Sequence, residues 1–242
     1  MRAMTDLIYS NNLNLLHDGE EKLRARSIRL VSDNQALLLH MAVAESAMDM
    51  LDMFRQMPTE DDDLKVVKML GLRTFNALAS SIKLMMSGYY QNSAMNMRDI
   101  LETVFLVDLF RTDRSLISKW RHADDKTLRK TFGPVVVRKA LDDRDGFNER
   151  KRKKMYRMFC ELAAHPTMKG FAMLRPKGMD AHGGPFLDPT ALEASVSELG
   201  RLAIQAGDIF NPFFPAPYQK ANQALEEFQR LKTRWIKELY SD

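Results

Sequence analysis

Apolar residues recur three and four positions apart along most of the chain, which is the spacing that places them on one face of an α-helix. The first long run of this kind covers residues 32–57, with Ser32 or Asp33 positioned to cap the helix and Pro58 positioned to end it. The same periodicity predicts further helices over about 64–90, 92–110, 113–123, 134–141, 145–164, 189–210 and 218–240. The pattern therefore predicts a mainly helical protein.

One stretch, from about 170 to 189, interrupts the helical pattern because glycines and prolines divide it into two short apolar runs. We predict a small irregular insertion or a β-hairpin there. No repeat of fixed period and no Gly/Ser-rich linker divides the rest of the chain. The sequence thus predicts an all-α multi-helix bundle with long antiparallel helices, organised as an N-terminal helical arm over 1–30 and a single helical domain over 31–242.

Composition narrows the class of protein without changing this picture. The chain has 242 residues, of which 45% are apolar and 28% are charged, as in an ordinary globular protein. Its most apolar runs fall well short of the roughly 20 residues that span a bilayer, and Asp6 interrupts the N-terminal segment where a signal peptide would be apolar. The single cysteine, Cys160, excludes an intrachain disulfide and a cysteine-rich zinc site within one chain. We therefore expect a cytoplasmic protein with no membrane segment, no bound metal and no cofactor.

Two sets of residues are assigned to the core rather than to a ligand site. His40 stands among leucines and is expected to be a buried histidine with its hydrogen bonds satisfied. The methionine clusters at 48–57 and 85–97 are expected to fill the core as adaptable apolar side chains. The long Met-rich amphipathic helices have more apolar face than one bundle can bury, which predicts a homodimer.

The positive charge is concentrated in one part of the chain. The formal net charge is only +4, but residues 111–177 contain 19 Lys and Arg against 8 Asp and Glu, which gives +11 there and −7 elsewhere. The densest run consists of Arg150, Lys151, Arg152, Lys153 and Lys154. Two interpretations stay open for this run: a solvated helix face, or a platform that binds the phosphates of a nucleic acid.

A polar stripe follows that basic run. Arg157, Glu161 and His165 are spaced four apart, so a single helix would present all three on one face over about 12 Å. An imidazole can move protons near neutral pH, and a guanidinium can hold a phosphate through two hydrogen bonds. These groups suit metal-independent cleavage of RNA, in which His165 shuttles the proton of the 2′-hydroxyl and Arg157 stabilises the charge on the phosphate. Glu161 would orient one of the other two.

A second polar pair lies on the predicted helix over 92–110, where Arg98 and Glu102 are also four apart. If this helix packs against the one that carries the stripe, Arg98 meets Glu161 and Glu102 meets Arg157. Tyr156 belongs to the same supporting network. This arrangement would be a buried ionic network, which is also the structural alternative to a catalytic site.

These residues carry a resemblance to a known family. An Arg followed by a His near the end of a helix, in an all-helical chain, resembles the HEPN superfamily of bacterial and archaeal defence and toxin proteins. More narrowly, the Arg98-x-x-x-Glu102 helix and the later His165-Pro166 look like a group of uncharacterised bacterial helical proteins, over about residues 70–210. Arg157 and His165 lie further apart than the Arg and His of the HEPN motif, and Met158 follows the Arg.

The resemblance implies a dimer that brings two Arg/His motifs together, and often RNA cleavage. The function expected from the sequence is therefore an HEPN-like, RNA-directed protein of a defence or mobile-element system, acting as a metal-independent endoribonuclease. The alternative is a non-catalytic helical homo-oligomeric interaction module, in which the Arg/Glu/His stripe is a structural network.

Overall fold

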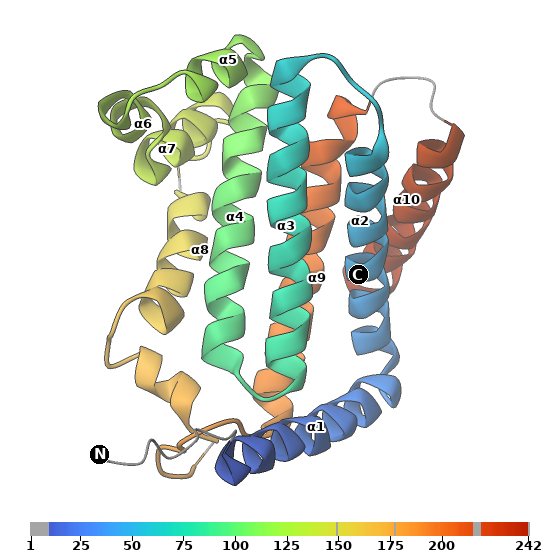
Figure 1. The fold of residues 1–242 in the computed structure, drawn as a ribbon, viewed down its shortest axis with the longest axis vertical. Coiled ribbons are helices and arrows are strands. Elements are labelled where there is room, and N and C mark those ends of the chain that lie inside the picture. Colours follow the sequence, from blue (N-terminus) through green and yellow to red (C-terminus); the bar gives the residue numbers. More distant parts are fainter. Residues whose placement is uncertain (1–9, 149, 177, 215–218, 242) are drawn as a thin grey trace, which may run out of the picture.

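The computed structural model describes residues 10–148, 150–176, 178–214 and 219–241 (Figure 1). The body of the protein consists of long helices packed side by side: α2 (Gln35–Gln56), α3 (Asp62–Met86), α4 (Tyr90–Thr112) and α9 (Pro189–Phe210). Helices α2, α4 and α9 run in one direction and α3 runs in the other (Figure 1). Helix α10 (Gln219–Leu239) packs antiparallel along α2, and α1 (Asn11–Ser32) crosses one end of the bundle. The expected all-α multi-helix bundle is confirmed.

Shorter helices cover the outer side of α4. They are α5 (Ser115–Arg121), α6 (Asp125–Phe132), α7 (Pro134–Arg144) and α8 (Lys151–Phe159). A π-helical turn, η1 (Cys160–Ala164), continues from α8, and the chain then forms a 3-10 turn, η2 (Gly170–Leu174). A last 3-10 turn, η3 (Asn211–Phe213), follows α9. Because α7, α8 and η1 all contact α4, this helix is the support on which the polar residues of the α8 region are placed.

Short polar side chains define where the long helices begin. The side chain of Asn34 accepts hydrogen bonds from the N–H groups of Ala36 and Leu37 and so caps α2. The sequence pattern placed this cap at Ser32 or Asp33, which is wrong because those residues form the end of α1, where the Asp33 N–H donates to the carbonyl of Arg29. Asp61 and Asp188 cap α3 and α9 in the same way.

The core lies between α2, α3, α4 and α9, with α10 closing one side. Phe54 and Phe210 are fully buried there, with ring centroids 6.3 Å apart. The methionines at 50, 57, 85, 86 and 97 are buried as expected, whereas Met95 is exposed. His40 is also buried as expected, and its Nδ1 accepts a hydrogen bond of 3.0 Å from the indole N–H of Trp235. In α2, Met50 is buried in the core, whereas Met41, Met48 and Met53 are only partly buried.

The stretch that links η1 to α9 differs from one of its two predicted forms. Residues 170–189 contain no strand in the part of the chain that the structure describes, so the hairpin alternative is not formed and the irregular insertion is. Within the stretch, the His182 N–H donates to the Leu174 carbonyl at 2.9 Å, and near its end the Phe186 N–H donates to the carbonyl of Gly88 in the α3–α4 turn. Gly88 has φ +88°, and a Cβ there would lie 2.4 Å from the Phe186 carbonyl oxygen, so this approach requires glycine.

The predicted helix over 145–164 is in fact shorter and irregular. Gly146 and Arg150 both have positive φ, which prevents a helix from running through residues 146–150, and α8 begins only at Lys151. The short helix α6, absent from the sequence prediction, lies before α7. The predicted arm over 1–30 corresponds to α1 from residue 11 onwards, and residues 1–9 and 218 of the predicted elements lie outside the described residues. Within the described ranges, no helix combines the length and the apolar character needed to cross a membrane.

Candidate functional site

The first part of the candidate site is an acidic residue that holds two cations at the surface. Glu161, in η1, accepts a hydrogen bond of 2.5 Å from Arg157 Nε through Oε1 and one of 2.7 Å from Lys169 Nζ through Oε2. These two bonds lower the pKa of Glu161, with Lys169 as the larger cause. The side chains of Arg157 and Lys169 are 70% and 69% exposed, so both cations face solvent while they share one carboxylate.

A local chain reversal brings Lys169 to this position. The Thr167 hydroxyl donates to the Glu161 carbonyl oxygen at 2.5 Å and accepts from the Gly170 N–H at 3.0 Å. The chain therefore folds back over the end of η1 immediately after Pro166. The sequence analysis did not include Lys169, because its approach to Glu161 depends on this reversal and not on helical spacing.

His165 ends the π turn. Its backbone N–H donates to the Cys160 carbonyl at 3.0 Å, and its own backbone is extended, as expected for a residue before proline. The side chain is exposed, and no other described residue forms a hydrogen bond or ion pair with its imidazole. Since α8 ends at Phe159 and the following turn has i→i+5 hydrogen bonds, the four-residue spacing no longer aligns His165 with Arg157 and Glu161. The structure thus pairs Arg157 with Glu161 and leaves the His165 side chain exposed at the end of the turn, outside this pair.

The supporting network forms with different partners from those expected. Arg98 Nη2 donates to Glu102 Oε1 at 2.8 Å and to the Tyr156 hydroxyl at 2.6 Å, and that hydroxyl donates to Glu102 Oε1 at 2.5 Å. The expected pairs between Arg98 and Glu161 and between Glu102 and Arg157 are wrong, because each carboxylate pairs with an arginine on its own helix or turn. Burial, followed by the hydrogen bond to Glu102, raises the pKa of Tyr156. Tyr156 is therefore the link that holds α8 to α4.

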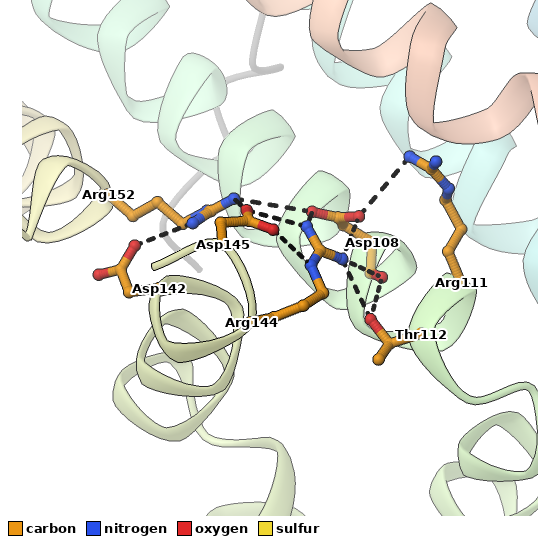
Figure 2. Close-up of polar contacts among 7 residues, drawn as sticks. All are labelled: Asp108, Arg111, Thr112, Asp142, Arg144, Asp145 and Arg152. Atoms are coloured by element: carbon orange, nitrogen blue, oxygen red, sulfur yellow. Dashed lines mark hydrogen bonds and ion pairs between the residues drawn. The ribbon is translucent and has the colours of Figure 1, made fainter. Parts of the chain in front are cut away.

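A second network, which the sequence analysis missed, also fastens this region to α4. In Figure 2, Asp108 lies at the centre and accepts a two-pronged contact from Arg144, with Nη1–Oδ1 and Nη2–Oδ2 distances of 2.9 and 3.0 Å. Arg152 donates to Asp142 at 2.9 Å and also bonds Asp145. Hydrogen bonds from Arg144 and then Arg152 lower the pKa of Asp145 to about 2. The network joins α4, α7 and the start of α8.

These contacts divide the basic run in two. Arg152 is only 12% exposed and points into the network of Figure 2, so its guanidinium lies away from the outer face. Arg150, Lys153 and Lys154 are exposed, and no carboxylate among the described residues lies within salt-bridge distance of them. Lys151 is exposed as well, with its ammonium 5.7 Å from the ring centroid of Phe147. We call Arg150, Lys151, Lys153, Lys154, Arg157 and Lys169 the outer cations.

No three His, Cys, Asp or Glu side chains come together as a metal-binding group in the ranges that the structure describes. Comparison of the chain with protein-family models, with curated proteins and with solved structures found no match.

Proposed function

We propose that the protein is a cytoplasmic, HEPN-like, RNA-directed protein of a defence or mobile-element system, which binds RNA along the outer cations and cleaves it at His165. The observation that carries the proposal is the placement of Arg157 and Lys169 together at the surface, on either side of one carboxylate, with the exposed His165 at the end of the same π turn. Cations that converge on one point at the surface suit a phosphodiester better than they suit an apolar or cationic ligand.

The binding step uses cations whose charge is not fully compensated. Arg157 bonds Glu161 through Nε alone, and no described residue contacts its two Nη groups, which are the pair that binds a phosphate in bidentate fashion. Lys153 and Lys154 extend the positive surface along α8. Binding that depends on these charges releases counterions from RNA, so the affinity falls steeply as salt increases.

The cleavage step needs only groups that the site holds. His165 accepts the proton of the 2′-hydroxyl, and the 2′-oxygen attacks phosphorus to form a 2′,3′-cyclic phosphate. The bond to the 5′-oxygen breaks, and this oxygen takes a proton from water. Arg157 and Lys169 stabilise the charge on the non-bridging oxygens, while Glu161 positions both cations. The step needs neither a metal nor a cofactor.

The test compares RNA cleavage by the full chain and by single variants, with EDTA present. We expect His165→Ala to lower the cleavage rate by about 10²-fold or more and Arg157→Ala by a similar factor. His122→Ala is the matched control, because His122 is exposed on the distant α5 end and its variant should keep the full rate. Neither the wild type nor any of these variants should cleave RNA that carries a 2′-deoxynucleotide at the cleaved position. Equal cleavage by wild type and His165→Ala would contradict the catalytic assignment.

A homodimer is part of the same proposal. Its support lies in α1, where Leu13, Leu15 and Leu16 are 44%, 67% and 38% exposed. Large exposed apolar side chains grouped at one end of a helix are typical of a surface that another chain covers. This differs from the reason expected from the sequence, which was the Met-rich face of the long helices; in α2, Met50 is buried.

A second candidate function is a non-catalytic interaction module. The observation in its favour is that Arg98, Glu102 and Tyr156 satisfy one another through hydrogen bonds of 2.5 to 2.8 Å and hold α8 on α4. In this case Arg157, Glu161 and His165 only stabilise the fold. The RNA experiment separates the two functions, because an interaction module would not cleave RNA, and replacement of Arg157 would not change its affinity for RNA.

A further inference from the structure

A cavity of about 260 Å³ is lined by residues of α3, α4, α5, α6 and α7. Phe105, Trp120 and Phe132 supply aromatic surface to its wall, and Trp120 and Phe132 both pack edge-on against the buried Phe110. The charged residues in the wall are Arg73, Asp99, Glu102 and Arg138. An apolar cavity with a few converging polar groups is the usual form of a small-molecule site.

Most of the charges in this wall already have partners. Arg73 Nη2 donates to Asp99 Oδ1 at 2.6 Å, which makes this pair neutral. Glu102 accepts from Arg98 at 2.8 Å and from the Tyr156 hydroxyl at 2.5 Å. Neither pair leaves a net charge for a ligand to balance.

Arg138 is the exception. It is only 7% exposed, its guanidinium carbon lies 3.8 Å from the ring centroid of Tyr156, and its buried Nη1 has no hydrogen-bond partner within the described part of the chain. Asp142, one helical turn further along α7, is placed to pair with it but accepts from Arg152 instead, at 2.9 Å. A buried guanidinium with no carboxylate partner is costly, and because Arg138 lines the cavity, an anion bound there would offset this cost by its charge.

We propose that this cavity binds a small aromatic monocarboxylate, with the carboxylate at Arg138 and the ring against Phe105, Trp120 and Phe132. The size fits, because a cavity of roughly 150 Å³ already holds benzene and one of about 260 Å³ accommodates a fused bicyclic ring or a ring with a short acidic side chain. The charge fits one carboxylate, since the wall has one uncompensated cation. A phosphate monoester carries about −1.5 to −2 near neutral pH and would place excess negative charge beside Glu102. The site is separate from the outer cations proposed to bind RNA.

Isothermal titration calorimetry on the full chain tests the proposal with pairs of compounds that differ only in charge. The acids are benzoate, phenylacetate and indole-3-acetate, and each is compared with its neutral amide. We expect at least one acid to bind about 10-fold or more tightly than its amide, because a hydrogen-bonded charge pair is worth at least this factor. Phenyl phosphate is expected to bind more weakly than that acid.

Arg138→Met keeps a long side chain over Tyr156 and removes the charge, so it should abolish the preference for the acid while the amide still binds. Arg129→Met is the matched control, because Arg129 is exposed on α6 and does not line the cavity. Circular dichroism of both variants checks that they fold. The proposal is overturned if no acid binds better than its amide, if phenyl phosphate or inorganic phosphate binds better than every acid, or if Arg138→Met keeps the preference.

Discussion

The network of Figure 2 gives the sharpest quantitative test of how this region is held together. Asp108 lies on α4 with a side chain only 7% exposed, and it contacts Arg144 at 2.9 and 3.0 Å and Arg111 at 3.6 Å. Asp108→Ala would remove the one carboxylate that Arg144 reaches on α4. The arginines from α4 and α7 would then face each other with no anion between them.

The size of the effect follows from burial. Removing one partner of a buried ion pair costs about 3–5 kcal/mol, because the other charge stays buried without compensation. The side chain of Arg144 is 33% exposed and keeps its contact with Asp145, so water and Asp145 recover part of this cost. We therefore expect Asp108→Ala to lower the free energy of unfolding by about 2–4 kcal/mol. In a chain of this length that corresponds to a decrease of roughly 4–16 °C in Tm.

Urea unfolding followed by circular dichroism at 222 nm measures this free energy. Glu227→Ala is the matched control, because its partner Arg230 lies at 2.6 Å on the same helix but both side chains are about half exposed or more. An exposed pair of this kind contributes at most about 1 kcal/mol. Asp108→Asn, which keeps the volume and removes the charge, should resemble Asp108→Ala. If Asp108→Ala and Glu227→Ala destabilise the protein equally, the network does not hold α7 on α4 and the reasoning fails.

Two further predictions concern the buried histidine and the oligomeric state. Burial, and then the charge of Arg201, lower the pKa of His40 to about 4, whereas the pKa of a histidine in an unfolded chain is near 6.5. As the pH decreases, the unfolded state therefore binds the proton before the folded state does. The free energy of unfolding should fall by up to about 3 kcal/mol between pH 6.5 and pH 4. In the His40→Asn variant the urea midpoint of unfolding should change less with pH over this range than in the wild type. An equal fall of the midpoint in both proteins would exclude the effect. Light scattering after size exclusion should give the mass of two chains, and Leu15→Glu should give one; a wild-type monomer would refute the dimer.

The helices are the part of the fold that the sequence predicts well, and α9 shows why, because its apolar residues follow the helical period. Helix α4 has no single apolar face, because α3, α9, α7 and α8 surround it. The period fails where the backbone leaves the α region. Gly146 and Arg150 adopt positive φ between α7 and α8, and the turn at Cys160–Ala164 is a π helix. No apolar spacing signals either feature in advance.

Sequence spacing likewise predicts some contacts of the candidate site and not others. Pairs on one helix, such as Arg157 with Glu161 and Arg98 with Glu102, follow from four-residue spacing and form as that spacing suggests. Contacts between elements do not follow from it. Tyr156 bridges two helices, and Lys169 reaches Glu161 only after the chain reverses. Such contacts depend on which helix faces meet, and one sequence does not contain that information.

The concentration of positive charge in residues 111–177 therefore has two distinct physical roles. Arg144 and Arg152 neutralise acidic groups beneath the surface, and Arg138 lies in a wall with no carboxylate partner. Arg144 and Arg152 hold α7 and α8 on α4, and Arg138 is the proposed partner of a bound carboxylate. These inward cations add little to the electrostatic potential outside the protein, because nearby acids or burial reduce it. Among the described basic residues of 150–169, the outer cations are the ones that present charge to a polyanion. The net charge of the segment thus overstates its capacity to bind phosphates, and the number of phosphates neutralised, measured from the salt dependence of RNA binding, should follow the outer cations and not the total for the segment.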